Sequence, residues 1–179
     1  MKYTSIILIV LFNIFAIFYL IQPIKSPPDL PNSLRSTLPG DTTQITNVRA
    51  YFTNLSRTEV INFYKANYGG LARVILNHPP EKSQEIFVDT MQSYYLEEFI
   101  IPFKESLYVN GFDWENDVFT KPEKRIVNKL IFEGKEFKSK ITIRTFPTSI
   151  PKRLAIFFMT EITLYLIYRC YLYSKKLKP

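Results

Sequence analysis

Cysteine and histidine are almost absent from this sequence. Among its 179 residues, Cys170 is the single cysteine and His78 the single histidine. One cysteine cannot form an intramolecular disulfide, and one residue of each kind cannot build an ordinary zinc site within a single chain. A serine or cysteine hydrolase would have to use His78, because its nucleophile needs a histidine base. We expect no bound metal and no cofactor.

Sequence motifs that mark known chemistry are missing as well. The chain contains no HExxH, CxxC, Gly-x-Ser-x-Gly or GxGxxG motif and no Walker loop. Its composition is 46% hydrophobic and 22% charged. These values exclude a disordered chain, a collagen, a coiled coil and a disulfide-rich scaffold. We therefore predict no catalytic residues and a protein that is not an enzyme.

A long apolar run is present at the N-terminus. Residues 3–24 contain no charge over 22 residues. As a helix they would span about 33 Å, enough to cross the hydrocarbon core of a membrane. The run is longer than the apolar part of a typical signal peptide and is not followed by a small-residue cleavage site. Residues 1–24 are therefore predicted to be an uncleaved transmembrane anchor, with a cleaved signal peptide or a buried helix as the alternatives.

A second apolar run, residues 154–173, contains Glu161 and Arg169. It predicts a transmembrane helix over 152–174, followed by a basic cytoplasmic tail, 175–179. The alternative is a helix that lies on the membrane surface or packs against the domain. A carboxylate facing lipid is unfavourable, so the face that carries Glu161 should meet the first helix or a partner. The residues expected in this intramembrane helix contact are Glu161, Asn13, Tyr165 and Tyr168.

The net charge of +7 lies mainly at the ends of the chain. Residues 25–151 hold 16 basic and 15 acidic residues and are nearly neutral. Lysine and arginine beside a membrane helix favour the cytoplasmic side. We therefore predict an integral membrane protein with both termini in the cytoplasm and the central part outside, although Lys25, Lys152 and Arg153 oppose this orientation. Nucleic acid is not an expected partner.

The central part is predicted to be a small α+β domain. Four prolines within residues 25–41 indicate a semi-extended linker, so the domain is expected over 42–151. The element order predicts a small antiparallel sheet with two or three helices. Strands are expected at 46–53, 73–77, 106–112, 126–132 and 137–146, and helices after the Ser56–Glu59 capping box, from His78 through Met91, and over 93–99.

Charge within this domain is polarised. Residues 81–117 hold nine acidic residues, and residues 121–144 hold eight basic ones. The two segments either neutralise each other or leave a basic hairpin free to bind acidic lipid headgroups. The binding residues of that hairpin would be Lys135, Lys138, Lys140 and Arg144.

The acidic residues offer a competing hypothesis. Asp113, Glu115 and Asp117 alternate as the ligands of a cation loop do, but Val118 and Lys124 stand where an EF-hand needs glycine and glutamate. Whether these three carboxylates bind a cation is left open. A hydrolase of the cell envelope would use Glu97, Glu98, Asp113 and Glu115.

The expected function is non-catalytic binding. We expect a membrane-anchored protein whose extracytoplasmic domain binds another envelope protein or a membrane component. The alternatives are the envelope hydrolase and a small accessory subunit of a membrane transport or secretion complex, in which Glu161 would lie on a polar path through the membrane.

Overall fold

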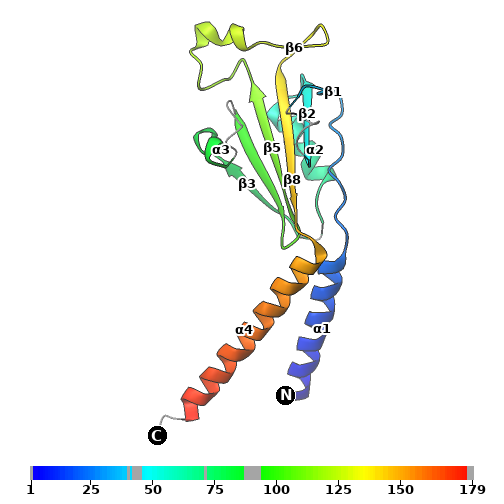
Figure 1. The fold of residues 1–179 in the computed structure, drawn as a ribbon, viewed down its shortest axis with the longest axis vertical. Coiled ribbons are helices and arrows are strands. Elements are labelled where there is room, and N and C mark those ends of the chain that lie inside the picture. The colour runs from blue at the N-terminus through cyan, green and yellow to red at the C-terminus, as the bar shows by residue number, and fades with distance from the viewer. Residues whose placement is uncertain (1, 40, 42–45, 71, 87–93, 177–179) are drawn as a thin grey trace. The chain divides into compact units, whose positions relative to one another are not determined.

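The chain forms two compact units. The computed structural model describes residues 2–39, 41, 46–70, 72–86 and 94–176. One unit is Lys25–Pro147, and the other combines Met1–Ile24 with Thr148–Pro179 (Figure 1).

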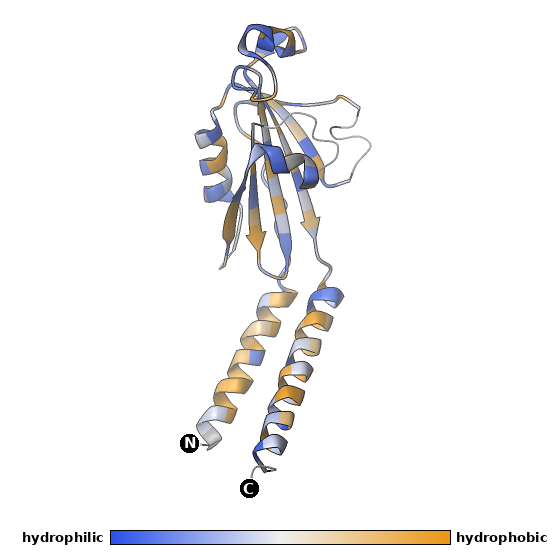
Figure 2. Ribbon diagram, turned by 90° about the vertical axis from the view of Figure 1, so that its left-hand side faces the viewer, coloured by the Kyte–Doolittle hydropathy of each residue, from blue (hydrophilic) through white to orange (hydrophobic). Residues whose placement is uncertain are grey.

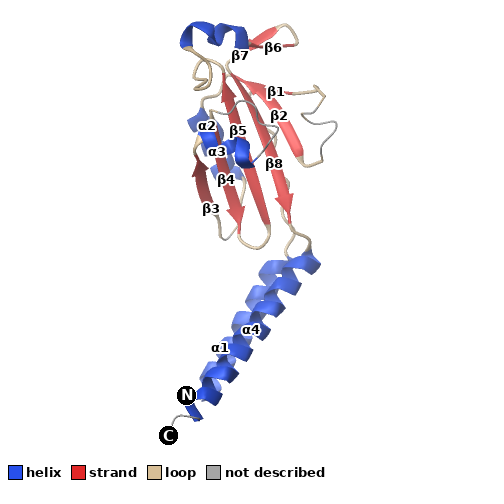
Figure 3. Cartoon of the chain, turned by 60° about the vertical axis from the view of Figure 1, so that its left-hand side comes forward, coloured by secondary structure: helices blue, strands red, loops and turns tan. Residues whose placement is uncertain are grey.

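A six-stranded antiparallel sheet forms the centre of the first unit (Figure 3). This confirms the predicted α+β class. Strand β8 lies inside the sheet between β2 and β5, so a strand from the end of the unit joins its beginning to its middle. In spatial order the strands are β1 (Ser33–Arg35), β2 (Val48–Thr53), β8 (Ser139–Pro147), β5 (Glu105–Asp113), β4 (Tyr95–Ile101) and β3 (Val74–His78).

Helix α2 (Arg57–Asn67) covers one face of this sheet. The predicted capping box is present: the Glu59 side chain accepts from the Ser56 backbone N–H, and the Ser56 hydroxyl accepts from the Glu59 N–H. Val60, Ile61 and Tyr64 are buried on the inner side of the helix. The Tyr64 ring meets Phe99 of β4 edge-on at 6.4 Å. Aromatic and aliphatic side chains between α2 and the sheet thus make one hydrophobic core.

The remaining elements lie on the opposite face and at one end of the sheet. Helix α3 (Pro80–Ile86) follows β3 in the chain. His78, predicted to open this helix, is instead the last residue of β3, and the helix begins at Pro80. A 3₁₀-helix, η1 (Pro122–Asn128), leads into the hairpin of β6 (Leu130–Phe132) and β7 (Lys135–Phe137). This hairpin turns at Glu133 and Gly134. Its second strand is β7, whereas the strand predicted over 137–146 is β8, which pairs with β2 and β5 in the main sheet.

Two predicted elements were wrong. The helix expected over 93–99 is strand β4, which begins at Tyr95. This strand is buried on both faces, so it lacks the alternation that identifies a half-buried strand. The strand expected over 126–132 is shortened to β6, because its first part belongs to η1. Phe87 and Met91, expected in a long second helix, lie outside the described residues.

The proline-rich segment is part of the first unit and not a free linker. It supplies β1, which pairs with β2 along the edge of the sheet. Leu30 is buried, and the Asp29 carboxylate accepts hydrogen bonds from Tyr51 and Arg49. Proline favours the extended conformation and is tolerated beside an edge strand, so the same prolines suit this packing. The unit therefore begins at Lys25 and not at residue 42.

The Tyr51–Asp29 contact makes this attachment sensitive to alkali. Burial, followed by the hydrogen bond to Asp29, raises the pKa of Tyr51 to about 12. A phenol whose pKa is raised on folding contributes stability that is fully present below pH 10 and is lost as the pH rises towards 12. We expect Tyr51→Phe to be less stable than the native chain by about 1 kcal/mol at pH 7, through its lost hydrogen bond.

The order of the two stabilities should reverse between pH 10 and 12, because ionisation of Tyr51 costs the native chain about 2 kcal/mol. Urea unfolding of the detergent-solubilised protein, followed by Trp114 fluorescence at several pH values, measures both. A stability difference that stays constant from pH 7 to pH 12 would contradict this assignment.

The second unit consists of two long helices, α1 (Lys2–Ile21) and α4 (Ile150–Lys176). Thr4–Ile21 and Ile150–Lys175 are long and apolar enough to cross a membrane. Figure 2 shows apolar residues along both helices, and most of the helices' described side chains are exposed. Such surfaces fit a lipid environment better than water. Length and composition thus agree with the two predicted spans.

Candidate functional site

A polar cluster lies on the sheet face that carries α3. Glu98 of β4 is opposite Leu76 of β3 and Tyr108 of β5, so the three side chains project from the same face of the sheet. The His78 Nε2 atom is 2.9 Å from a Glu98 carboxylate oxygen, and the Tyr108 hydroxyl also donates to Glu98. Glu98 is nearly buried, with a side chain only 10% exposed. Its two donors compensate the cost of burying a carboxylate.

The environment of this cluster keeps Tyr108 protonated. Burial, the larger cause, and the hydrogen bond to Glu98 together raise the pKa of Tyr108 to about 12. Next to it, Ile86, Ser106, Tyr108 and Phe146 line a small cavity of about 190 Å³. The cluster can therefore donate and accept hydrogen bonds beside a small apolar recess. In the part of the chain that the structure describes, no hydroxyl or thiol nucleophile is hydrogen-bonded to His78.

Glu97 and Glu98 lie on opposite faces, because neighbouring residues in a strand alternate. On the face that carries α2, the Glu97 carboxylate accepts from Arg57 of α2 at 2.5 Å and from Asn77 of β3 at 2.8 Å. Asp113 and Glu115 are at and beyond the far end of β5. The four carboxylates of the hydrolase hypothesis are therefore not gathered into one site. The sequence predicts a helix over 93–99 and therefore does not reveal this separation.

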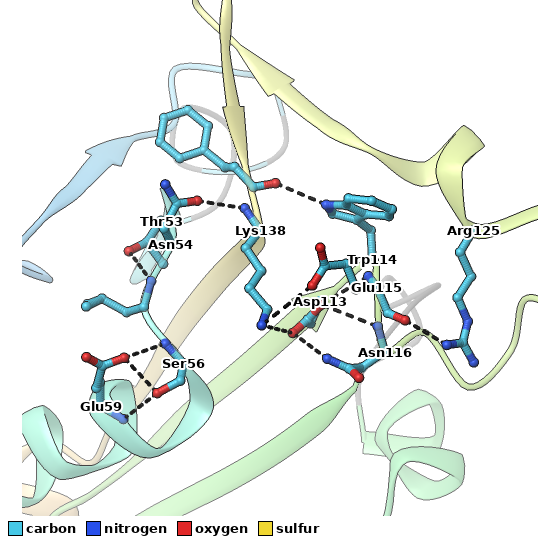
Figure 4. Close-up of polar contacts among 12 residues, drawn as sticks. Thr53, Asn54, Ser56, Glu59, Asp113, Trp114, Glu115, Asn116, Arg125 and Lys138 are labelled. Carbon is cyan, nitrogen blue, oxygen red and sulfur yellow. Dashed lines mark hydrogen bonds and ion pairs between the residues drawn. The ribbon is translucent and has the colours of Figure 1, made fainter. Parts of the chain in front are cut away.

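The loop after β5 uses its carboxylates to hold itself together (Figure 4). Asp113 accepts from the backbone N–H groups of Glu115 and Asn116 and from the Asn116 side chain. Asp117 accepts from the Phe119 N–H and from Asn128. Protein donors thus occupy the oxygens that a cation would need. Over the described residues, His, Cys, Asp and Glu side chains form no group of three that could hold a metal ion.

Two of the four residues predicted to form the basic hairpin, Lys138 and Lys140, pair with acidic residues. Lys138 Nζ lies 3.6 Å from Glu115 and 3.9 Å from Asp113, as Figure 4 shows. Lys140 Nζ is 2.7 Å from Asp41. The guanidinium of Arg144 lies over the Phe146 ring at 5.2 Å, and Lys135 is exposed. The four predicted binding residues therefore do not form one free basic face. The ion pairs of Lys138 join the basic segment to the acidic one, whereas Lys140 pairs with Asp41, which lies outside the acidic segment.

In the second unit, the four residues predicted to form the intramembrane contact differ in their exposure. Asn13 and Glu161 are only partly exposed, and Asn13 donates to the Ile9 carbonyl of its own helix. Tyr165 and Tyr168 are both more than half exposed, and the Tyr165 hydroxyl accepts from Arg169 on the same helix. Asn13 and Glu161 thus lie on the less exposed sides of their helices, and the two tyrosines do not.

Arg153 joins the two helices, a role that the sequence did not suggest. It is 5% exposed and donates to the Leu20 carbonyl at 3.0 Å and the Gln22 carbonyl at 3.2 Å. Its Nε also donates to the Thr148 carbonyl at 2.7 Å. The last carbonyls of a helix lack partners within the helix and carry partial negative charge, so a guanidinium there is favourable. The sequence offers one signal for this contact. An arginine lies in the first turn of one apolar helix, and another apolar helix ends elsewhere in the chain.

Comparison of the chain with protein-family models, with curated proteins and with solved structures finds no match.

Proposed function

We propose that this chain is an integral membrane protein whose central unit, held outside the cytoplasm, binds an envelope protein or a membrane component without catalysis. The observation that carries the proposal is the order of the two units along the chain. Two apolar helices, most of whose side chains are exposed, come before and after one compact domain, Lys25–Pro147. A domain that begins and ends at membrane spans is held beside the bilayer.

The contacts of Arg153 support the proposed orientation. In a count of flanking charges, Arg153 and Lys152 favour a cytoplasmic location for the start of α4. Arg153, however, is bonded to carbonyls at the end of α1, so part of its charge is compensated within the protein. Lysines 175, 176 and 178 and Lys2 then outweigh the basic residues at the other ends of the helices.

Thiol labelling in intact cells tests this topology. In a Cys170→Ser background, a cysteine is introduced either at Thr58, exposed on α2, or at Ser174, exposed near the end of α4. We expect Thr58→Cys to react with a membrane-impermeant maleimide in intact cells. Ser174→Cys should react only after the cells are permeabilised, because the C-terminal tail is proposed to be cytoplasmic.

Labelling of Ser174→Cys but not Thr58→Cys in intact cells would reverse the topology and reject the extracytoplasmic location. The binding part is tested separately, by cross-linking in cells and by sizing in mild detergent. A chain that remains monomeric and cross-links to neither protein nor lipid would reject it.

A further inference from the structure

The segment between β5 and β8 holds apolar side chains out in solvent. We call residues 118–137 the apical segment. No side chain of η1, described over its full length, is buried, and Ile126 and Val127 are 67% and 83% exposed. The exposed large apolar residues of the segment are Val118, Phe119, Ile126, Val127 and Ile131.

Polar contacts hold these apolar residues in place. Arg125 donates to the carbonyls of Glu115 and Thr120, and Asn128 donates to Asp117 and to the Thr120 hydroxyl. In η1, therefore, the Arg125 and Asn128 side chains bond the loop while Ile126 and Val127 face water. This reverses the usual arrangement, in which burial of apolar surface stabilises the fold. The exposed Ile126 and Val127 contribute little to folding and are available for an intermolecular contact.

The hairpin of the apical segment is attached to the sheet. Phe132 stacks on Phe52 of β2 with ring centroids 4.5 Å apart. The Trp114 indole N–H donates to the Phe137 carbonyl at 3.2 Å. The segment is thus preorganised, so a partner would not have to order it on binding.

The apical segment lies at the end of the sheet remote from both chain exits of the first unit (Figure 1). It connects Asp113 to Ser139, which are opposite each other at one end of β5 and β8, and β8 then runs about 30 Å to Pro147. On the N-terminal side, the Pro27 carbonyl accepts from Arg49, which pairs with Ile143 towards the Pro147 end of β8. Further along the chain, Ser33 lies opposite Thr53, near the apical end. The chain therefore also enters from the end away from the apical segment.

Basic residues accompany the exposed aliphatic ones. The segment contains five bases, Lys121, Lys124, Arg125, Lys129 and Lys135, against three acids, Glu123, Glu133 and Glu136. Aliphatic side chains beside lysines suit an anionic bilayer, in which the chains enter the interface while the lysines meet headgroup phosphates.

We propose that the apical segment binds an anionic bilayer other than the one that holds the helices. Ile126 and Val127 enter its interface, and Lys121 and Lys124 contact its headgroups. A facing bilayer is chosen because both chain exits lie at the other end of the sheet. This inference rests on the proposed function and names the membrane component that the central unit binds.

Vesicle co-flotation tests this assignment. The full chain is placed in nanodiscs of zwitterionic lipid and mixed with vesicles that contain 30 mol% or no phosphatidylglycerol. We expect the nanodiscs to float with the anionic vesicles. The double variant Ile126→Asn, Val127→Asn should reduce binding at least about 100-fold, because two aliphatic side chains lose their apolar environment. Lys121→Gln, Lys124→Gln should reduce it about tenfold and weaken its salt dependence.

Phe103→Asn is the matched control. Phe103 is also 67% exposed, but it lies in the β4–β5 turn at the other end of the sheet. Binding should be unchanged in this variant, and empty nanodiscs should not float. Absence of binding by the native chain, or equal losses in Phe103→Asn and the double variant, would overturn the proposal. If cross-linking in cells then joins the apical segment to a protein, this inference fails while the proposed binding function stands.

Discussion

Replacing Gly111 by alanine should destabilise the central unit by about 3 kcal/mol, the cost of forcing extra volume into a packed site. Gly111 of β5 is paired directly with Tyr95 of β4, and the Tyr95 ring lies over the glycine. A β-carbon at residue 111 would overlap this ring. The ring cannot easily move, since Tyr95 is 3% exposed and the Arg57 guanidinium lies 5.0 Å from its centroid.

Gly70→Ala is the matched control, because a β-carbon at Gly70 would meet nothing within 4 Å and its φ is not positive. Its stability should change by less than about 0.5 kcal/mol. A double-mutant cycle locates the cause: Gly111→Ala should cost little in a Tyr95→Val background. Urea unfolding followed by Trp114 fluorescence measures the four proteins of the cycle and the Gly70→Ala control. A full cost that persists in the Tyr95→Val background would show that the ring is not responsible.

Replacing Arg153 by methionine should separate the two helices. The change keeps an unbranched side chain but removes every donor to the carbonyls of Leu20, Gln22 and Thr148. Loss of charged hydrogen bonds to otherwise unpaired carbonyls costs about 2 to 3 kcal/mol. The angle between α1 and α4 should then vary, because their apolar side chains gain little by packing together in lipid.

Spin labels on Ile6→Cys and on the native Cys170 report this change as a distance distribution. We expect a broader distribution in Arg153→Met than in the native chain. Lys152→Met is the matched control, since Lys152 is the adjacent cation and is exposed. If both variants keep the native distribution, Arg153 does not hold the helices together.

Local signals were enough to predict several elements. The Ser56–Glu59 capping box locates the start of α2, and Gly69-Gly70 follows closely after its end at Asn67. The turn at Gly134 joins two short strands, and alternation in β8 separates buried Ile141 and Ile143 from their neighbours. Each of these signals lies within a few residues of the structure that it predicts, so no knowledge of distant contacts is needed.

The candidate sites depended on contacts that the sequence does not reveal. Lys140 pairs with Asp41, and Arg153 reaches Leu20, across 99 and 133 residues. Glu97 and Glu98 are neighbours in sequence, yet the strand directs one to Arg57 and the other to His78. Which charges remain free is decided by these pairings, so a basic run alone overstated the exposed charge of the hairpin.

The sequence by itself determined the two apolar spans, the α+β class of the middle and most element positions, because hydropathy, capping and turn chemistry act locally. Only the tertiary structure decided that the proline-rich segment joins the sheet, that β4 is a central strand, and that η1 presents Ile126 and Val127 to solvent. The physical reason is the same in each case. Burial on a sheet face depends on which strands are neighbours, and that order is set by pairings between residues far apart in the chain.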